Sequence, residues 1–116
     1  MIGIGTDIVS VKRFKGIEKK RAMLEKIFTE KEIAYALSKA VSAETFAGHF
    51  AAKEAIIKAF TSFGKKLGFK DVEITHLKNK QPIAFIKNFK GYTILLSIAH
   101  ETDYAVSSAL VTDTQI

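Results

Sequence analysis

The stretch FAGHFAAKEAIIKAF, residues 46–60, predicts a long helix that carries two charges where apolar side chains are expected. At about 100° per residue, one stripe of this helix collects its large apolar side chains, which are Phe46, Phe50, Ile57 and Phe60. Lys53 falls inside the stripe and Glu54 lies at its edge. Burying a charge is costly unless the charge is paired or bound to a metal, so the pattern calls for a partner.

Two interpretations of these charges stay open at this level. Glu54 could meet a metal ion or a basic group on another element. Alternatively, Glu54 and Lys58 form an ordinary i,i+4 pair worth about 0.2–0.5 kcal/mol, while Lys53 extends its ammonium out of the core to solvent.

Ahead of this helix, residues 2–9 predict a strand whose two faces differ. One face carries Ile2, Ile4, Thr6 and Ile8, and the other carries Gly3, Gly5, Asp7 and Val9. The missing side chains at the two glycines would let a helix or a ligand approach closely, so Asp7 could meet a group on a neighbouring element. The alternative is that Asp7 ends the strand and caps the following turn.

The remaining pattern predicts helices first and strands afterwards. Residues 12–28 carry helix formers interrupted at Gly16, the capping box at 29–32 starts a helix to about Lys39, and Ser42 starts the long helix. After a turn region at 61–68 the period changes to two, which predicts strands at 72–76, 83–87, 92–99 and 104–111 arranged as an antiparallel meander. We therefore expect an α+β fold and a single domain over residues 1–116.

Composition excludes several classes of site. The chain has 116 residues, 47% of them hydrophobic, and no cysteine, which excludes disulfides, zinc-thiolate sites, iron–sulfur clusters and a thiol nucleophile and fits a cytoplasmic location. No signal peptide and no run of about 20 apolar residues is expected, so no membrane partner is predicted. The net charge of +6 indicates an anionic partner without naming it.

Residues 12–21 hold six of the basic side chains against the single acid Glu18. Such a run is usually a solvated helix face, but its density also suits docking of an acidic protein. Nucleic-acid binding would need interleaved aromatic side chains, and this segment offers only Phe14. His100, at the end of a predicted strand, is most simply a histidine bonded to a backbone carbonyl, and the three histidines lack metal-ligand spacing.

Three segments in order resemble a known family over essentially the whole chain. They are GIGTDIV (residues 3–9), FAAKEA (residues 50–55) with Lys58 one turn later, and SIAH (residues 97–100) followed by YA (residues 104–105). Together they resemble the holo-(acyl-carrier-protein) synthases, the small bacterial 4′-phosphopantetheinyl transferases. One departure is His49, which stands where the family usually has Arg.

The resemblance implies transfer of 4′-phosphopantetheine from coenzyme A to a serine of apo acyl carrier protein, releasing adenosine 3′,5′-bisphosphate, in fatty acid biosynthesis. It implies a homotrimer with active sites between subunits, and Mg²⁺ held by Asp7 and Glu54, which act with Lys58 in catalysis. The residues expected at coenzyme A are His49, Lys53, Lys58, Gly64 and His100. Carrier docking is implied for Arg13 and is extended on charge alone to Lys19, Lys20 and Arg21.

Two other functions remain as alternatives. A non-enzymatic basic module would dock an acidic protein or nucleic acid through residues 12–21. A structural subunit with no site would leave the charges at Lys53 and Glu54 unexplained.

Overall fold

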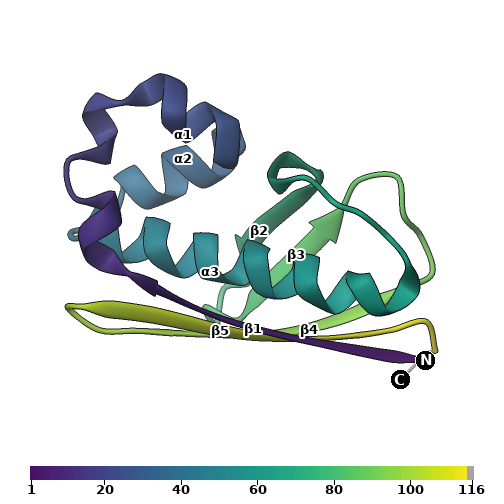
Figure 1. Cartoon of the computed structure of the whole chain (residues 1–116). Coiled ribbons are helices and arrows are strands. Elements are labelled where there is room, and N and C mark those ends of the chain that lie inside the picture. The colour runs from purple at the N-terminus through teal and green to yellow at the C-terminus, as the bar shows by residue number, and fades with distance from the viewer. Residues whose placement is uncertain (115–116) are drawn as a thin grey trace.

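The computed structural model describes residues 1–114 and shows helices packed on one side of an antiparallel sheet (Figure 1). The elements are β1 (Ile2–Ser10), 3-10 turns (Val11–Phe14, Ile17–Lys19), α1 (Arg21–Ile27), α2 (Glu30–Leu37), α3 (Ser42–Phe60), 3-10 turns (Thr61–Phe63, Phe69–Asp71), β2 (Val72–His76), β3 (Pro82–Ile86), β4 (Thr93–His100) and β5 (Tyr104–Thr112). The α+β class and the long central helix are confirmed. Within residues 1–114, every helix is too short or too polar to cross a membrane.

The strands form two sheets rather than one meander. β1 and β4 flank β5 in a three-stranded antiparallel sheet, while β2 and β3 pair only with each other. The predicted meander is therefore wrong at the step from β3 to β4, because alternation shows that a segment is a strand but not which strand it pairs with. In the register of the larger sheet, Asp7 lies opposite Ser107, which lies opposite Ile98.

Two glycines of β1 allow α3 to lie directly on the sheet. A Cβ at Gly5 would lie 1.8 Å from the carbonyl oxygen of Ala55, and one at Gly3 would lie 2.0 Å from that of Ala59. No side chain fits at either position, so the predicted glycine face of β1 is the face that packs against α3. Asp7 lies on that same face, and the strand therefore aims its carboxylate toward the helix.

The segment before α2 is less helical than its composition suggests. Gly16 has φ +73°, in the left-handed region, and it separates the two 3-10 turns that precede the short α1. The capping box is confirmed: the Thr29 amide donates to Glu32 Oε1 at 2.8 Å, and the Glu32 amide donates to Thr29 Oγ1 at 3.3 Å. This box starts α2 and, at the same time, directs the Glu32 side chain inward.

Figure 1 shows that one face of the sheet is turned away from the helices, and several large apolar side chains on this face are exposed. Ile4 is 68% exposed, Ile8 65%, Tyr104 54% and Leu95 52%. These side chains come from all three strands of the sheet. A group of exposed large apolar side chains on one face often marks an interaction site, such as an interface with another protein.

Candidate functional site

Asp7 and Lys58 form an exposed ion pair between β1 and α3. Lys58 Nζ donates to Asp7 Oδ1 at 3.1 Å and to the carbonyl oxygen of Thr6 at 3.0 Å. The side chains are 17% exposed for Asp7 and 51% for Lys58. Asp7 lies in the middle of β1 and contacts a helix, so the alternative in which it caps a turn is wrong.

Glu54 lies one helical turn before Lys58 and about 40° from it around α3, at the edge of the side that faces β1. Glu54 is partly buried. Lys58 donates to Asp7, so the simple Glu54–Lys58 pair is not the arrangement found. Glu54 and Lys58 thus occupy neighbouring positions on α3, and Lys58 reaches Asp7 of β1.

The carboxylates at this flank suit a magnesium ion better than a metal ion whose ligands are all protein side chains. Over residues 1–114, no group of three or more His, Cys, Asp or Glu side chains is placed to hold a metal. Mg²⁺ needs only one or two protein carboxylates, because it keeps water and takes phosphate oxygens from the substrate. Asp7 already attracts a cation, the Lys58 ammonium. Asp7 and Glu54 are therefore the kind of ligands that the Mg²⁺ implied by the resemblance would need.

Lys53 has a different role from the one predicted. Its ammonium lies 2.8 Å from Glu32 Oε1, both side chains are fully buried, and it also donates to the carbonyl oxygens of Phe69 and Val72. Burial lowers the pKa of Lys53, while the Glu32 carboxylate opposes that shift. All three donors are used inside the protein, so Lys53 neither reaches solvent nor is available to coenzyme A, and both expectations are corrected.

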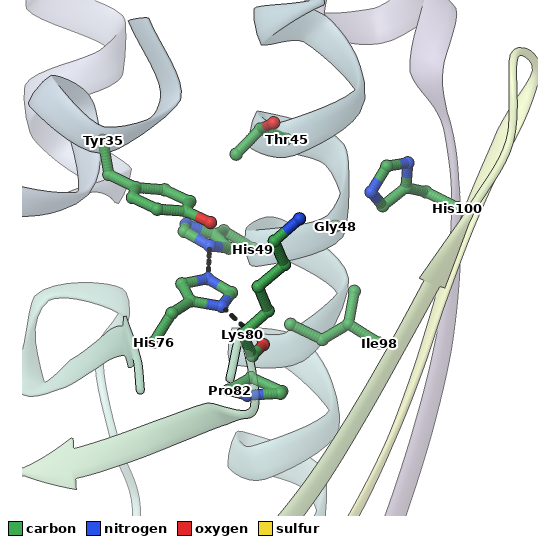
Figure 2. A pocket seen from close by; sticks show the side chains of 9 residues that line it. All are labelled: Tyr35, Thr45, Gly48, His49, His76, Lys80, Pro82, Ile98 and His100. Atoms are coloured by element: carbon green, nitrogen blue, oxygen red, sulfur yellow. Dashed lines mark hydrogen bonds between the residues drawn. The ribbon is translucent and has the colours of Figure 1, made fainter. Parts of the chain in front are cut away.

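A pocket of about 210 Å³ lies on another flank of α3, and all three histidines of the chain line it (Figure 2). His49 comes from α3, His76 from the end of β2 and His100 from the end of β4. His100 Nδ1 lies 2.9 Å from Glu44 Oε1, so its partner is a carboxylate rather than the expected backbone carbonyl. Lys80 adds a basic side chain to the lining.

His49 is the most buried of the three and is part of a stack of rings. It is 2% exposed, and its Nε2 lies 2.9 Å from His76 Nε2. Tyr35 stacks on both imidazoles, as Figure 2 shows. Burial lowers the pKa of His49 to about 3, and positive charge on His76, Lys53 and His100 adds to the shift. His49 is therefore neutral at ordinary pH, unlike an arginine at this position.

The two groups of predicted site residues lie toward opposite edges of the sheet. Asp7 is on β1 and His100 is on β4, with β5 between them. Because neighbouring strands are about 4.8 Å apart, two strand intervals separate the edges by about 10 Å, and α3 packs over the sheet between them. One chain therefore presents two half-sites, one acidic and one rich in histidine.

The other predicted residues lie at the surface. The Arg13 guanidinium lies over the ring of Phe50, 5.0 Å from its centroid, and Lys19 and Lys20 are exposed. Arg21 is instead placed near two acids of its own chain, Glu25 at 3.8 Å and Glu30 at 3.7 Å. Gly64, with φ +67°, ends the 3-10 turn after α3 and is exposed.

Sequence reasoning missed Glu32 and His76. Glu32 was assigned only to the capping box, although the same carboxylate bonds Lys53 and accepts from the Ile74 amide at 2.7 Å. The one available signal was Lys53 itself, a charge in an apolar stripe that required a partner. His76 gave no local signal, because its partner His49 is 27 positions away in the chain.

Comparison with known proteins shows that the chain is similar to members of one family. The family model for the 4′-phosphopantetheinyl transferase superfamily matches residues 3–109. A holo-[acyl-carrier-protein] synthase of Caldicellulosiruptor saccharolyticus is 41% identical, with 95% of each chain covered. Among solved structures, the Bacillus anthracis holo-(acyl-carrier-protein) synthase in complex with CoA (3′,5′-ADP) has a TM-score of 0.79 at 31% identity, with 94% of each chain covered. The Helicobacter pylori holo-[acyl-carrier-protein] synthase in complex with coenzyme A has a TM-score of 0.77 at 30% identity, with 97% of this chain and 100% of that chain covered.

Proposed function

The chain belongs to the 4′-phosphopantetheinyl transferase superfamily, and on that premise we propose that it transfers 4′-phosphopantetheine from coenzyme A to a serine of an apo acyl carrier protein. The observation that carries the proposal is the ion pair between Asp7 of β1 and Lys58 of α3, with Glu54 one helical turn before Lys58. The family is one of enzymes, so the non-enzymatic alternatives are not retained. We assign residues 1–116 to one transferase domain.

In this reaction the serine oxygen forms a bond to phosphorus while a P–O bond of the pyrophosphate breaks, and adenosine 3′,5′-bisphosphate leaves. Mg²⁺ held by Asp7 and Glu54 would supply positive charge at the pyrophosphate. Lys58 is exposed enough to leave Asp7 and donate to a phosphate oxygen, where charge builds up as the bond breaks. The serine proton can pass to Glu54 or to a water molecule beside it.

The separation of the two half-sites supports an active site shared between subunits. Asp7 and His100 lie at opposite edges of the sheet in one chain, whereas two copies side by side can bring the acidic edge of one to the histidine edge of the other. The exposed apolar face that includes Ile4, Ile8 and Leu95 offers the surface for such assembly. We therefore retain the homotrimer and place His49, Gly64 and His100 among the residues around coenzyme A.

The basic cluster supports docking of an acidic carrier protein. Arg13, Lys19 and Lys20 are exposed and available, while the charge of Arg21 is partly satisfied by Glu25 and Glu30. We propose that the carrier is that of fatty acid biosynthesis. The lack of cysteine fits a reducing, cytoplasmic setting for the reaction.

Mass spectrometry of the carrier protein tests the proposal. The chain is incubated with apo acyl carrier protein, coenzyme A and Mg²⁺, and we expect the carrier to gain one phosphopantetheine group while adenosine 3′,5′-bisphosphate appears in equal amount. Chelation of the metal, or Asp7→Asn, should abolish the gain while the melting temperature stays near that of the parent. An unmodified carrier in the presence of the folded parent chain and Mg²⁺ would overturn it.

A further inference from the structure

Lys58 brings a positive charge to the same carboxylate that the proposed function gives to a metal ion. Its ammonium donates to two oxygen atoms of β1, the carbonyl oxygen of Thr6 at 3.0 Å and Asp7 Oδ1 at 3.1 Å. Carbonyl and carboxylate oxygens are also the ligands that Mg²⁺ and Mn²⁺ prefer in proteins. In the free chain, Lys58 is therefore the cation at Asp7.

The carboxylate is the fixed member of this ion pair. β1 pairs with β5 from Ile2 to Ser10, and Asp7 lies opposite Ser107 in that register. The same strand packs closely against α3 at Gly5, and the Asp7 side chain is only 17% exposed. A carboxylate with so little water around it is stabilised by a positive partner. The loss of one cation from Asp7 is therefore favourable only if another cation replaces it.

The ammonium is the movable member. Lys58 lies in the last turn of α3, where its own carbonyl oxygen accepts from Thr61 Oγ1, so its backbone position is fixed. Its side chain is half exposed, and lysine carries its charge on a flexible four-carbon stem. An ammonium that leaves Asp7 regains water, so its departure costs little. A change of cation at Asp7 requires only a lysine side chain to move.

We propose that Lys58 is an internal counter-ion of the metal site: its ammonium neutralises Asp7 in the free chain, and a divalent cation that binds Asp7 has to displace it. The assignment of Asp7 to a metal rests on the proposed function. One consequence is that metal binding and the release of Lys58 toward the phosphates of the coenzyme are a single event. A second consequence is that Lys58 weakens metal binding to the free chain, although it supports the transfer reaction.

Neighbouring charges do not take over this role. Within residues 1–114, Lys58 is the one basic side chain at ion-pair distance from Asp7. Glu54, one turn before Lys58, is an acid and adds to the attraction for a cation. Lys66 lies beyond the end of α3 and is exposed. Lys66→Met therefore removes the same charge as Lys58→Met while the ion pair stays intact, and it serves as the matched control.

Binding of Mn²⁺ to the free chain, measured by electron paramagnetic resonance without coenzyme or carrier protein, tests the competition. We expect the Kd of Lys58→Met to lie about two- to fivefold below that of the parent, which is the range that one exposed ion pair accounts for, and the Kd of Lys66→Met to stay near the parent value. Metal affinity and turnover of Lys58→Met then change in opposite directions. An unchanged or raised Kd in Lys58→Met, an equal fall in Lys66→Met, or no Mn²⁺ binding to parent and Lys58→Met would each overturn the proposal.

Lysine side-chain NMR during a titration with Mg²⁺ tests the displacement itself. The Lys58 signals are those missing from Lys58→Met, and Asp7→Ala supplies their positions when the carboxylate is gone. We expect Mg²⁺ to move the Lys58 signals of the parent toward those positions and to shift the carboxyl signal of Asp7, while the Lys66 signals stay in place.

The same titration separates this inference from the proposed function. An Asp7 carboxyl signal that moves with Mg²⁺ while the Lys58 signals stay would overturn the displacement, and carrier modification by that chain would leave the transferase standing. An Asp7 signal that does not respond to Mg²⁺ would overturn both the displacement and the assignment of Asp7 to the metal.

Discussion

Two lysines of α3 pair with carboxylates in opposite surroundings. Lys53 lies 2.8 Å from Glu32 with both side chains fully buried, and two backbone carbonyls occupy its remaining donors. Lys58 lies 3.1 Å from Asp7 at a surface where half of the lysine side chain is exposed. The first pair cannot rearrange without leaving a buried charge, whereas the second can exchange partners at little cost.

The difference separates stability from chemistry on one helix. Breaking a buried pair by removing one partner costs about 3–5 kcal/mol, because the other charge is left uncompensated, whereas an exposed pair is worth about 0–1 kcal/mol. The side of α3 that carries Lys53 and His49 therefore holds α2 and the β2–β3 hairpin in place. The flank that carries Glu54 and Lys58 is left free to bind ligands.

The largest expected effect is on the exposed flank. Glu54→Gln and Asp7→Asn should each reduce kcat for carrier modification by about a hundredfold or more, because each removes a carboxylate from the proposed metal site. Thermal unfolding should change little for either variant, since neither carboxylate belongs to the core. Steady-state kinetics with both variants at saturating Mg²⁺ checks the prediction, and near-parent kcat in either one would contradict it.

The next effect tests the contact that positions this flank. Gly5→Ala should lower the free energy of unfolding by about 3 kcal/mol or more, because its Cβ would lie 1.8 Å from the Ala55 carbonyl oxygen and α3 would have to move off β1. Gly68→Ala is the matched control, since its Cβ meets nothing closer than 3.4 Å. Denaturant titrations of the two variants should differ clearly; equal stabilities would show that α3 is not seated on β1 as described.

A smaller effect, on the other side of α3, depends on pH. Burial lowers the pKa of His49 from 6.5 to about 3, so between these values the unfolded chain binds a proton that the folded chain does not. Stability should therefore fall as the pH drops through this window, with the unfolding equilibrium shifting by up to about tenfold per pH unit from this residue. Unfolding of the parent and of His49→Asn, measured across the window, should show a shallower slope in the variant. Equal slopes would place His49 outside the core.

The smallest effect concerns carrier docking. Arg13→Glu should raise the KM for an acidic carrier protein by about three- to tenfold at low salt and less at high salt, with kcat nearly unchanged. Lys78→Glu, an exposed charge reversal outside residues 12–21, is the control. A KM that responds equally to both variants would indicate a general charge effect rather than a docking surface.

The sequence predicted most of the fold because its strongest patterns are local. Alternation in residues 2–9 showed that the glycines and Asp7 share a face, the capping box placed the start of α2, and the apolar stripe predicted α3 from Ser42 to Phe60. Local patterns do not show which strands pair when the strands lie far apart in the chain. Neither the contact of β1 with β5 nor the break between β3 and β4 follows from alternation.

The site was predicted in part for the same reason. The hypothesis of a partner for Asp7 on a neighbouring element is supported, since Lys58 occupies that position. Lys53 was misassigned, because a lysine in an apolar stripe looks the same in sequence whether its partner is a ligand or a buried carboxylate such as Glu32. His76 could not be found, because only the fold brings it to His49.

One substitution made at two positions tests the central claim most directly. Lys53→Met and Lys58→Met are compared by free energy of unfolding and by kinetics of carrier modification under conditions where both are folded. We expect Lys53→Met to lose about 3–5 kcal/mol of stability while its folded fraction keeps near-parent kcat and KM for coenzyme A, and Lys58→Met to lose about 1 kcal/mol or less while its catalysis falls at least tenfold. A stable Lys53→Met with a raised KM for coenzyme A, or a fully active Lys58→Met, would contradict the division of the helix into a structural side and a reactive flank.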